Sequence, residues 1–118
     1  MLFICYPKCT TCGKARKWLE EKGVLYDFRD IKLNNPTYDE LKTWAVKSNL
    51  PLRRFFNTSG LIYKSLGLKD KLTDMNEEEQ LQLLSTDGML VKRPLLISED
   101  FVLVGFKEKE WNEYLNIT

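Results

Sequence analysis

The order of elements in the first 31 residues constrains the fold more than any other feature of the chain. Residues 2–6, "LFICY", form a short apolar run typical of a β-strand. Residues 11–22 place apolar side chains at i, i+3 and i+4, which predicts an amphipathic helix ending at a glycine. Residues 24–31, "VLYDFRDI", alternate apolar and polar side chains, which predicts a second strand. The chain therefore begins with a βαβ unit.

A Cys9-Thr10-Thr11-Cys12 motif lies in the first loop of this unit, where it could be a redox centre, a metal site or two small residues at a helix start. Unpaired backbone N–H groups in the first helical turn favour the thiolate form of Cys9. Cys12 lies one turn further on the same side of the helix, so it can reach back to resolve a mixed disulfide. The position predicts Cys9 as nucleophile and Cys12 as resolving thiol.

The other two interpretations of the motif explain less. A structural zinc site needs four ligands, and the chain has no histidine and only one further thiol, Cys5, so we expect no metal. Cys5 itself lies in the first apolar run, where a free cysteine behaves as a small hydrophobe. Two inert residues would not account for both thiols standing at a strand-to-helix junction.

The rest of the chain predicts a run of helices and then a β-hairpin. Helical patterns or turns follow at about 37–49, after Pro51, at 61–68 and at 76–85; apolar runs at 94–98 and 101–105 predict paired strands, and a final helix covers 107–115. The tryptophans Trp18, Trp44 and Trp111 sit at helical spacings beside other apolar residues, which predicts core positions. This is the order of a thioredoxin-like α/β fold carrying a helical insertion at about 37–85, in one domain spanning 1–118.

Composition excludes several functions. A formal charge of +1 gives no electrostatic argument for direct nucleic-acid binding. The longest apolar runs are strand-sized, far below the roughly 20 residues that span a bilayer. The first nine residues lack the basic region and cleavage site of a signal peptide, and three cysteines do not resemble a secreted disulfide framework. We therefore expect a cytoplasmic protein without a membrane partner.

Arg93 is the second candidate site residue. It precedes Pro94, which favours an extended backbone at the start of the hairpin. Its guanidinium presents a planar fork that suits an oxyanion or carboxylate, although most arginines are simply exposed surface charges. The polar residues Asn57, Thr58 and Ser59 are typical of a helix cap.

Five segments together, in this order, resemble one family: "YPKCTTCGKARKWLEE", "FFNTSG", "LGLKDKL", "DGMLVKRPLL" and "VGFKEKEW". They are similar to the arsenate-reductase-like proteins (ArsC, Spx and MgsR), which include regulators that bind RNA polymerase. The resemblance implies a thioredoxin-like fold with a mixed four-stranded sheet. It also implies a catalytic Cys9, a Cys9–Cys12 redox switch and an Arg93-Pro94 pair whose cis proline faces the loop holding Thr10 and Thr11.

The same resemblance leaves three functions open. The first is a thiol-dependent oxidoreductase without a bound cofactor, reduced by thioredoxin, glutaredoxin or glutathione. The second is a redox-sensing regulator that binds the RNA polymerase α-subunit. The third is arsenate reduction proper, with Arg93 holding the oxyanion; further arginines of those enzymes correspond here to Gly13, Asn57 and the neighbourhood of Phe106, where Lys107 is the nearest cation.

Overall fold

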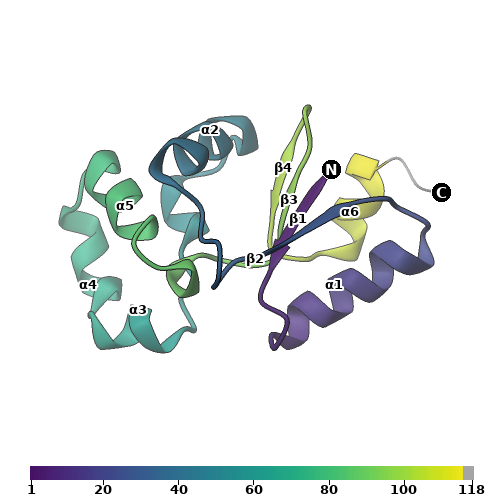
Figure 1. The fold of residues 1–118 in the computed structure, drawn as a ribbon. Helices are drawn as coiled ribbons and strands as arrows, with labels where there is room; N and C mark the ends of the chain where they lie inside the picture. Colours follow the sequence, from purple (N-terminus) through teal and green to yellow (C-terminus); the bar gives the residue numbers. More distant parts are fainter. Residues whose placement is uncertain (116–118) are drawn as a thin grey trace.

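The computed structural model describes residues 1–115, which fold around a mixed sheet of four short strands (Figure 1). The strands are β1 (Leu2–Cys5), β2 (Asp27–Asp30), β3 (Leu95–Ile97) and β4 (Val102–Val104), in the order β2-β1-β3-β4. β1 is parallel to β2 and antiparallel to β3, and β4 is antiparallel to β3. The predicted βαβ unit, hairpin and four-stranded sheet are confirmed.

Helices cover both faces of the sheet. On one face lie α1 (Thr10–Glu21) and α6 (Glu108–Leu115); on the other lie α2 (Tyr38–Ser48), α3 (Leu61–Ser65), α4 (Leu68–Lys71) and α5 (Glu77–Leu84). Three short 3₁₀ turns, Leu52–Phe55, Leu72–Asp74 and Gly88–Leu90, join the second group. Within the described part of the chain, every helix is too short or too polar to cross a bilayer. The helical insertion predicted at 37–85 is the group α2 to α5.

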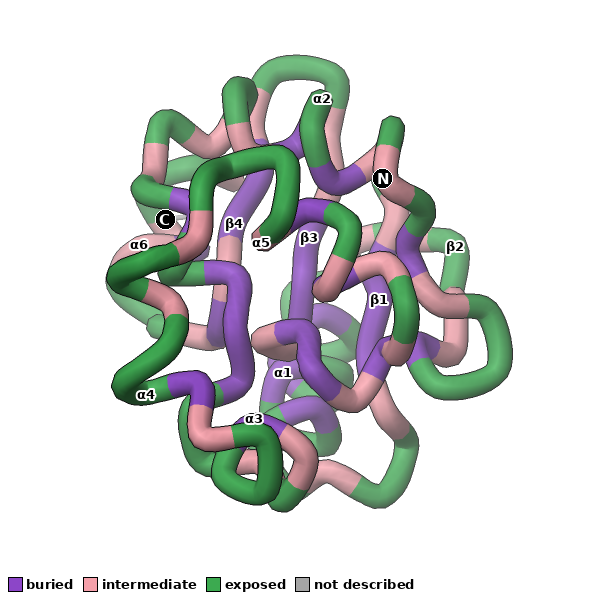
Figure 2. The backbone as a smooth tube through the Cα atoms, turned by 90° about the vertical axis from the view of Figure 1, so that its left-hand side faces the viewer, coloured by how far each residue is buried: buried purple, intermediate pink, exposed green. Residues whose placement is uncertain are grey.

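Side-chain alternation along β1 divides the interior into two cores, which Figure 2 shows as buried tube on both sides of the sheet. Phe3 and Cys5 face α1 and α6, whereas Ile4 faces the insertion. Trp18 and Trp111 pack edge to face in the first core, 5.9 Å between ring centroids. All three tryptophans are buried, as predicted, with Trp44 in the second core. Cys5 therefore points toward the helix that carries the C-x-x-C motif.

Two capping boxes fix where the insertion helices begin. The Thr37 hydroxyl accepts the Glu40 N–H at 3.1 Å, and the Glu40 carboxylate accepts the Thr37 N–H at 3.0 Å. Asn76 and Glu79 repeat this exchange at the start of α5. These reciprocal bonds satisfy N–H groups that a helix start leaves unpaired, and both starts agree with the sequence pattern.

Strand β2 is shorter than the alternation over 24–31 predicts. The Val24 N–H donates to the Leu19 carbonyl at 3.0 Å, completing the turn that ends α1 around Gly23, which has a φ of 69°. That bond holds Val24 to the helix end. Pairing with β1 therefore begins only at Asp27.

Arg29 of β2 anchors the insertion to the sheet. Its guanidinium donates to both Glu40 carboxylate oxygens, at 2.7 and 2.9 Å, and to the carbonyls of Asn34 and Asn35. This fork geometry is bidentate, and Arg29 is largely buried. Hydrogen bonds from Arg29, more than offsetting burial, hold the pKa of Glu40 below its usual value.

Glu40→Gln is expected to lower the free energy of unfolding at pH 7 by about 1–2 kcal/mol, discounted for the partial exposure of Glu40. Because the pKa of Glu40 is lower in the folded than in the unfolded protein, ionised Glu40 stabilises the fold at pH values above its unfolded pKa of about 4.3. This stabilisation is lost as the pH falls through the folded pKa. The difference in unfolding free energy between wild type and Glu40→Gln, measured by urea titration, should therefore shrink at acid pH. Glu21→Gln, whose exposed pair with Lys17 spans 4.0 Å, should change little; equal effects of both substitutions would contradict the anchoring role.

Candidate active site

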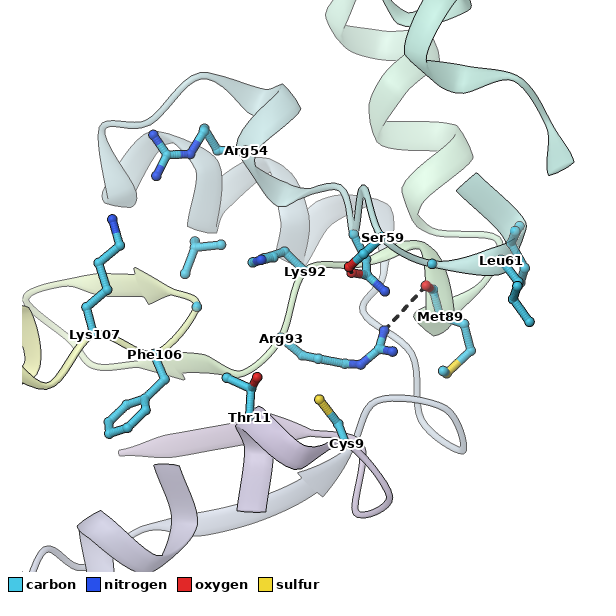
Figure 3. Close-up of a pocket in the computed structure, with 15 residues that line it drawn as sticks. Cys9, Thr11, Arg54, Ser59, Leu61, Met89, Lys92, Arg93, Phe106 and Lys107 are labelled. Carbon is cyan, nitrogen blue, oxygen red and sulfur yellow. Dashed lines mark hydrogen bonds between the residues drawn. The ribbon is translucent and has the colours of Figure 1, made fainter. Parts of the chain in front are cut away.

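A cavity of about 710 Å³ opens between the start of α1, the insertion and the β3–β4 hairpin (Figure 3). Cys9 lines it together with four cationic side chains: Arg54, Lys92, Arg93 and Lys107. None of the fifteen residues found to line it is acidic. Four positive charges that line one cavity with a thiol, without an acidic lining residue to neutralise them, make a site suited to an anion.

Cys9 is the N-cap residue of α1. Its extended backbone (φ −83°, ψ 127°) turns the loop into the helix, and its carbonyl accepts the Gly13 N–H at 3.0 Å. The thiol makes no capping hydrogen bond with the described residues and is half-buried. In Figure 3 its sulfur points into the cavity, on the side where the Arg93 side chain lies. The predicted nucleophile thus lies at the cavity wall, at the positive end of a helix.

Cys12 lies behind this wall and not in the cavity. It is 1% exposed, and its Sγ accepts the Tyr6 N–H at 3.3 Å. A side-chain hydrogen bond to Cys5, added to burial, raises the pKa of Cys12 above its ordinary value, while the same bond lowers the pKa of Cys5. These surroundings favour the thiol form of Cys12, which belongs to the buried cluster against which Cys9 packs.

Arg93 keeps most of its donor capacity free. Its Nη1 donates to the Met89 and Val91 carbonyls at 3.4 Å, longer than the usual 2.7–2.9 Å for charge-assisted bonds to an anion. Its Nε is buried and has no partner among the residues described, and its Cζ lies 5.6 Å from the centre of the Tyr6 ring. The fork is held in place by weak contacts and can exchange them for a stronger acceptor.

The remaining predicted residues divide between the cavity and its surroundings. The Arg93–Pro94 peptide bond is cis, as the resemblance implies. Pro94 is buried and its carbonyl accepts the Gly105 N–H at 2.8 Å, so it supports the wall without lining it. Thr11 lines the cavity, whereas Thr10 is exposed outside it.

Sequence reasoning missed two of the four cations, Arg54 and Lys92. Arg54 stands in the 3₁₀ turn after Pro51, directly before the "FFNTSG" segment, and Lys92 precedes Arg93. A basic residue next to one family segment and another inside a second segment were the available signal. Exposed cations are common, however, and only the fold brings these two to one cavity.

The helix-cap interpretation of residues 57–59 is wrong. The N-cap of α3 is Gly60, and no side chain caps that helix within the described chain. Asn57 is instead buried, donates its N–H to the Leu90 carbonyl at 2.7 Å and lines the cavity beside Ser59. This backbone hydrogen bond joins the insertion, which carries Asn57, to the loop that precedes Arg93.

Comparison with known proteins agrees with this arrangement. The chain is 51% identical over 113 residues to the uncharacterized protein YusI of Bacillus subtilis, covering 96% of each. It is 28% identical over 109 residues to the global transcriptional regulator Spx of Enterococcus faecalis, covering 92% of this chain and 81% of that one. The crystal structure of an ArsC-family-related protein from Bacteroides fragilis superposes with a TM-score of 0.94 at 56% identity, covering 95% of this chain and 94% of that one.

The sequence model of the ArsC family matches residues 5–114, nearly the whole chain. The match includes all three cysteines, the cis proline and the cations of the cavity. With its thioredoxin-like sheet and helical insertion, the chain belongs to the ArsC family.

Proposed function

We propose that this protein is a cytoplasmic thiol–disulfide oxidoreductase that acts on anionic disulfides, with Cys9 as nucleophile and Cys12 as resolving thiol. One observation carries the proposal: the Cys9 thiol shares a cavity with four cations and no acidic lining residue, and a second thiol is buried behind it. An inert helix-start cysteine would need neither feature.

In the first step the Cys9 thiolate attacks one sulfur of the substrate disulfide. A Cys9–substrate mixed disulfide forms, the substrate S–S bond breaks, and the other half leaves as a thiolate. Arg93, which lines the same cavity as Cys9, holds the anionic group of the substrate through its free N–H donors. Lys92 adds positive charge in the same cavity, which raises the local substrate concentration.

In the second step Cys12 attacks the Cys9 sulfur. The Cys9–Cys12 disulfide forms, the bound half of the substrate leaves, and the Cys12 proton goes to the leaving thiolate. Because Cys12 is buried outside the cavity and its surroundings favour the thiol form, it competes little with Cys9 for substrate and acts only inside the mixed disulfide. An external dithiol or two molecules of a small thiol, such as glutathione, then reduce the protein again.

A disulfide suits the site better than arsenate. The resemblance to arsenate reductases implies further oxyanion-binding arginines at two positions, which are held in this chain by Gly13 and Asn57. Gly13 is exposed and does not line the cavity, so this position supplies no contact to a small oxyanion there. The cavity cations come instead from positions spread over a volume of about 710 Å³, which fits a larger anion.

The direct test is capture of the substrate with Cys12→Ser. This variant should accumulate a mixed disulfide on Cys9, because the thiol that releases it is missing; non-reducing electrophoresis and mass spectrometry identify the partner. Cys9→Ser with an intact Cys12 is the matched control and should capture nothing. Capture on Cys12 in that control, or none on Cys9, would contradict the assigned roles.

Charge selectivity provides a second prediction. Replacing Arg54 and Lys92 together by glutamine should slow reaction with the dianionic dithiobis-nitrobenzoate about tenfold at low salt, and leave the neutral dithiodipyridine within about twofold. Stopped-flow absorbance measures both rates. Lys14→Gln removes an exposed cation of α1 outside the cavity and should leave the ratio of the two rates unchanged. If the double variant slows the reaction with dithiodipyridine as much as the reaction with dithiobis-nitrobenzoate, charge recognition is excluded.

A redox-sensing regulator is the second candidate function. It is favoured by the similarity to Spx along 92% of this chain combined with a Cys12 placed to bridge to Cys9. Pull-down of the RNA polymerase α chain through its C-terminal domain, with the protein in its oxidised and in its reduced form, tests this role. Binding in neither state would remove it and leave the oxidoreductase proposal standing.

A further inference from the structure

The structure brings a third thiol to the two of the motif. Cys5 is the last residue of β1 and, like Cys12, is 1% exposed. Both belong to the core between the sheet and α1, and Cys9 packs against that core from the cavity side. Cys12 therefore lies between a half-buried thiol at the cavity and a fully buried thiol on the sheet.

Two observations place Cys12 beside Cys5. The Tyr6 N–H, which belongs to the residue directly after Cys5, donates to the Cys12 Sγ at 3.3 Å. Cys5 and Cys12 are also both buried in the one cluster against which Cys9 packs, and their interaction shifts the pKa values of the two thiols in opposite directions. Because Cys12 lies in one cluster with Cys5 and beside Cys9, it can exchange one disulfide partner for the other.

We propose that Cys5 is a third redox-active thiol, which displaces Cys9 from the Cys9–Cys12 disulfide and stores the oxidised state as a buried Cys5–Cys12 disulfide. The inference rests on the proposed function, which supplies the Cys9–Cys12 bond. It assigns chemistry to a residue that packing alone does not require to be a cysteine.

The exchange balances without any added oxidant or reductant. The Cys5 sulfur attacks the Cys12 sulfur, the Cys5–Cys12 bond forms and the Cys9–Cys12 bond breaks. The Cys9 thiolate is the leaving group and takes the proton that Cys5 gives up. The protein keeps the same two-electron oxidation throughout, and the reverse attack by Cys9 on Cys12 restores the first disulfide.

The two disulfides differ in their access to reductant. The sulfur of Cys9 lies at the cavity, so an external thiol can attack the Cys9–Cys12 bond there. Cys5 and Cys12 are both 1% exposed, so the second bond must return to Cys9 before it is reduced. The oxidised protein would then consist of a rapidly and a slowly reduced form.

Tryptic cleavage separates the two bonds directly. Cutting after Lys8 and Lys14 releases the peptides "MLFICYPK" and "CTTCGK", so Cys9–Cys12 is a loop within one peptide, whereas Cys5–Cys12 joins two. We would oxidise the native protein with diamide, quench in acid, block free thiols with N-ethylmaleimide and map the bonds by tandem mass spectrometry. The expected result is both products, with the blocking group on Cys9 in the joined pair.

Each other outcome overturns a defined statement. The loop alone would refute the role of Cys5 and leave the proposed function intact, and a Cys5–Cys9 bond would also refute it. The absence of any disulfide would contradict the proposed function and the relay with it. In Cys9→Ser, formation of the Cys5–Cys12 bond should slow at least about tenfold, because oxidant reaches these buried thiols through Cys9. An unchanged rate would show that oxidation of Cys5 and Cys12 does not pass through Cys9.

Kinetics of reduction give a readout that packing would not produce. Oxidised wild type treated with glutathione should regain free thiols in two phases, and Cys5→Ala should retain only the fast one. If alanine loosens the core, Cys5→Val replaces the lost volume and should give the same single phase. A slow phase that survives in both folded variants would exclude Cys5 from the exchange.

Discussion

Cys9→Ser is expected to lower the proposed disulfide-exchange activity by at least about three orders of magnitude, since a serine hydroxyl is a weak nucleophile without an adjacent base. The cavity offers no such base: its charged lining residues are Arg54, Lys92, Arg93 and Lys107, besides the thiol itself. The substitution is small, and the Cys9 side chain makes no capping bond with the described residues, so stability should change by less than about 1 kcal/mol. Loss of activity at constant stability separates chemistry from folding.

The measurement is the rate of reaction with dithiobis-nitrobenzoate in the folded protein, counted per thiol. Lys14→Ala provides the control on the same helix, because Lys14 is exposed and lies outside the cavity. Cys12→Ser should still react once, at Cys9, and then stop. If Cys9→Ser reacts as fast as wild type, the fast thiol is another cysteine, and the function proposed for Cys9 fails.

Gly88→Ala has the largest effect that we expect on stability, about 3 kcal/mol or more. A Cβ on Gly88 would come within 1.7 Å of the Ile31 carbonyl oxygen and 2.7 Å of its carbonyl carbon. The Ile31 backbone cannot move aside freely, because its N–H donates to the Cys5 carbonyl at 3.0 Å. The loop that leads to Arg93 must shift instead, and the cavity with it.

Gly13→Ala is the matched control for this effect. A Cβ on Gly13 would meet nothing within 4 Å, and α1 should gain about 0.5–1 kcal/mol from the better helix former. Urea denaturation of both variants measures the contrast. A Gly88→Ala protein within about 1 kcal/mol of wild type would mean that the close approach to Ile31 relaxes at little cost.

Much of the fold could be predicted because its signals are local. The amphipathic spacing of α1 and the capping boxes at Thr37 and Asn76 act within a few residues. The late start of β2 was missed at Val24, whose N–H is used by the helix before it. Alternation of apolar side chains could not show this. Val24 and Tyr26 pack against the same core, and a strand that began at Val24 would place them there as well.

The candidate site was less predictable because its parts converge from distant segments. Cys9, Cys12 and Arg93 could be selected from their own neighbours in sequence. Arg54 becomes part of the cavity only because the insertion packs over the sheet, which no local pattern encodes. Cys5 was interpreted as a small hydrophobe, and its contact with Cys12 depends on which face of β1 turns toward α1.

The anchoring of the insertion through Arg29 and Glu40 has a consequence for how this architecture can diversify. Every thiol lies between residues 5 and 12, on the side of α1, whereas Arg54 and Asn57 reach the cavity from the insertion. The thiols and part of the cation set of the cavity therefore come from separate segments. Under the proposed function, a change at Arg54 or Asn57 would alter which anions the cavity accepts and leave all three thiols in place.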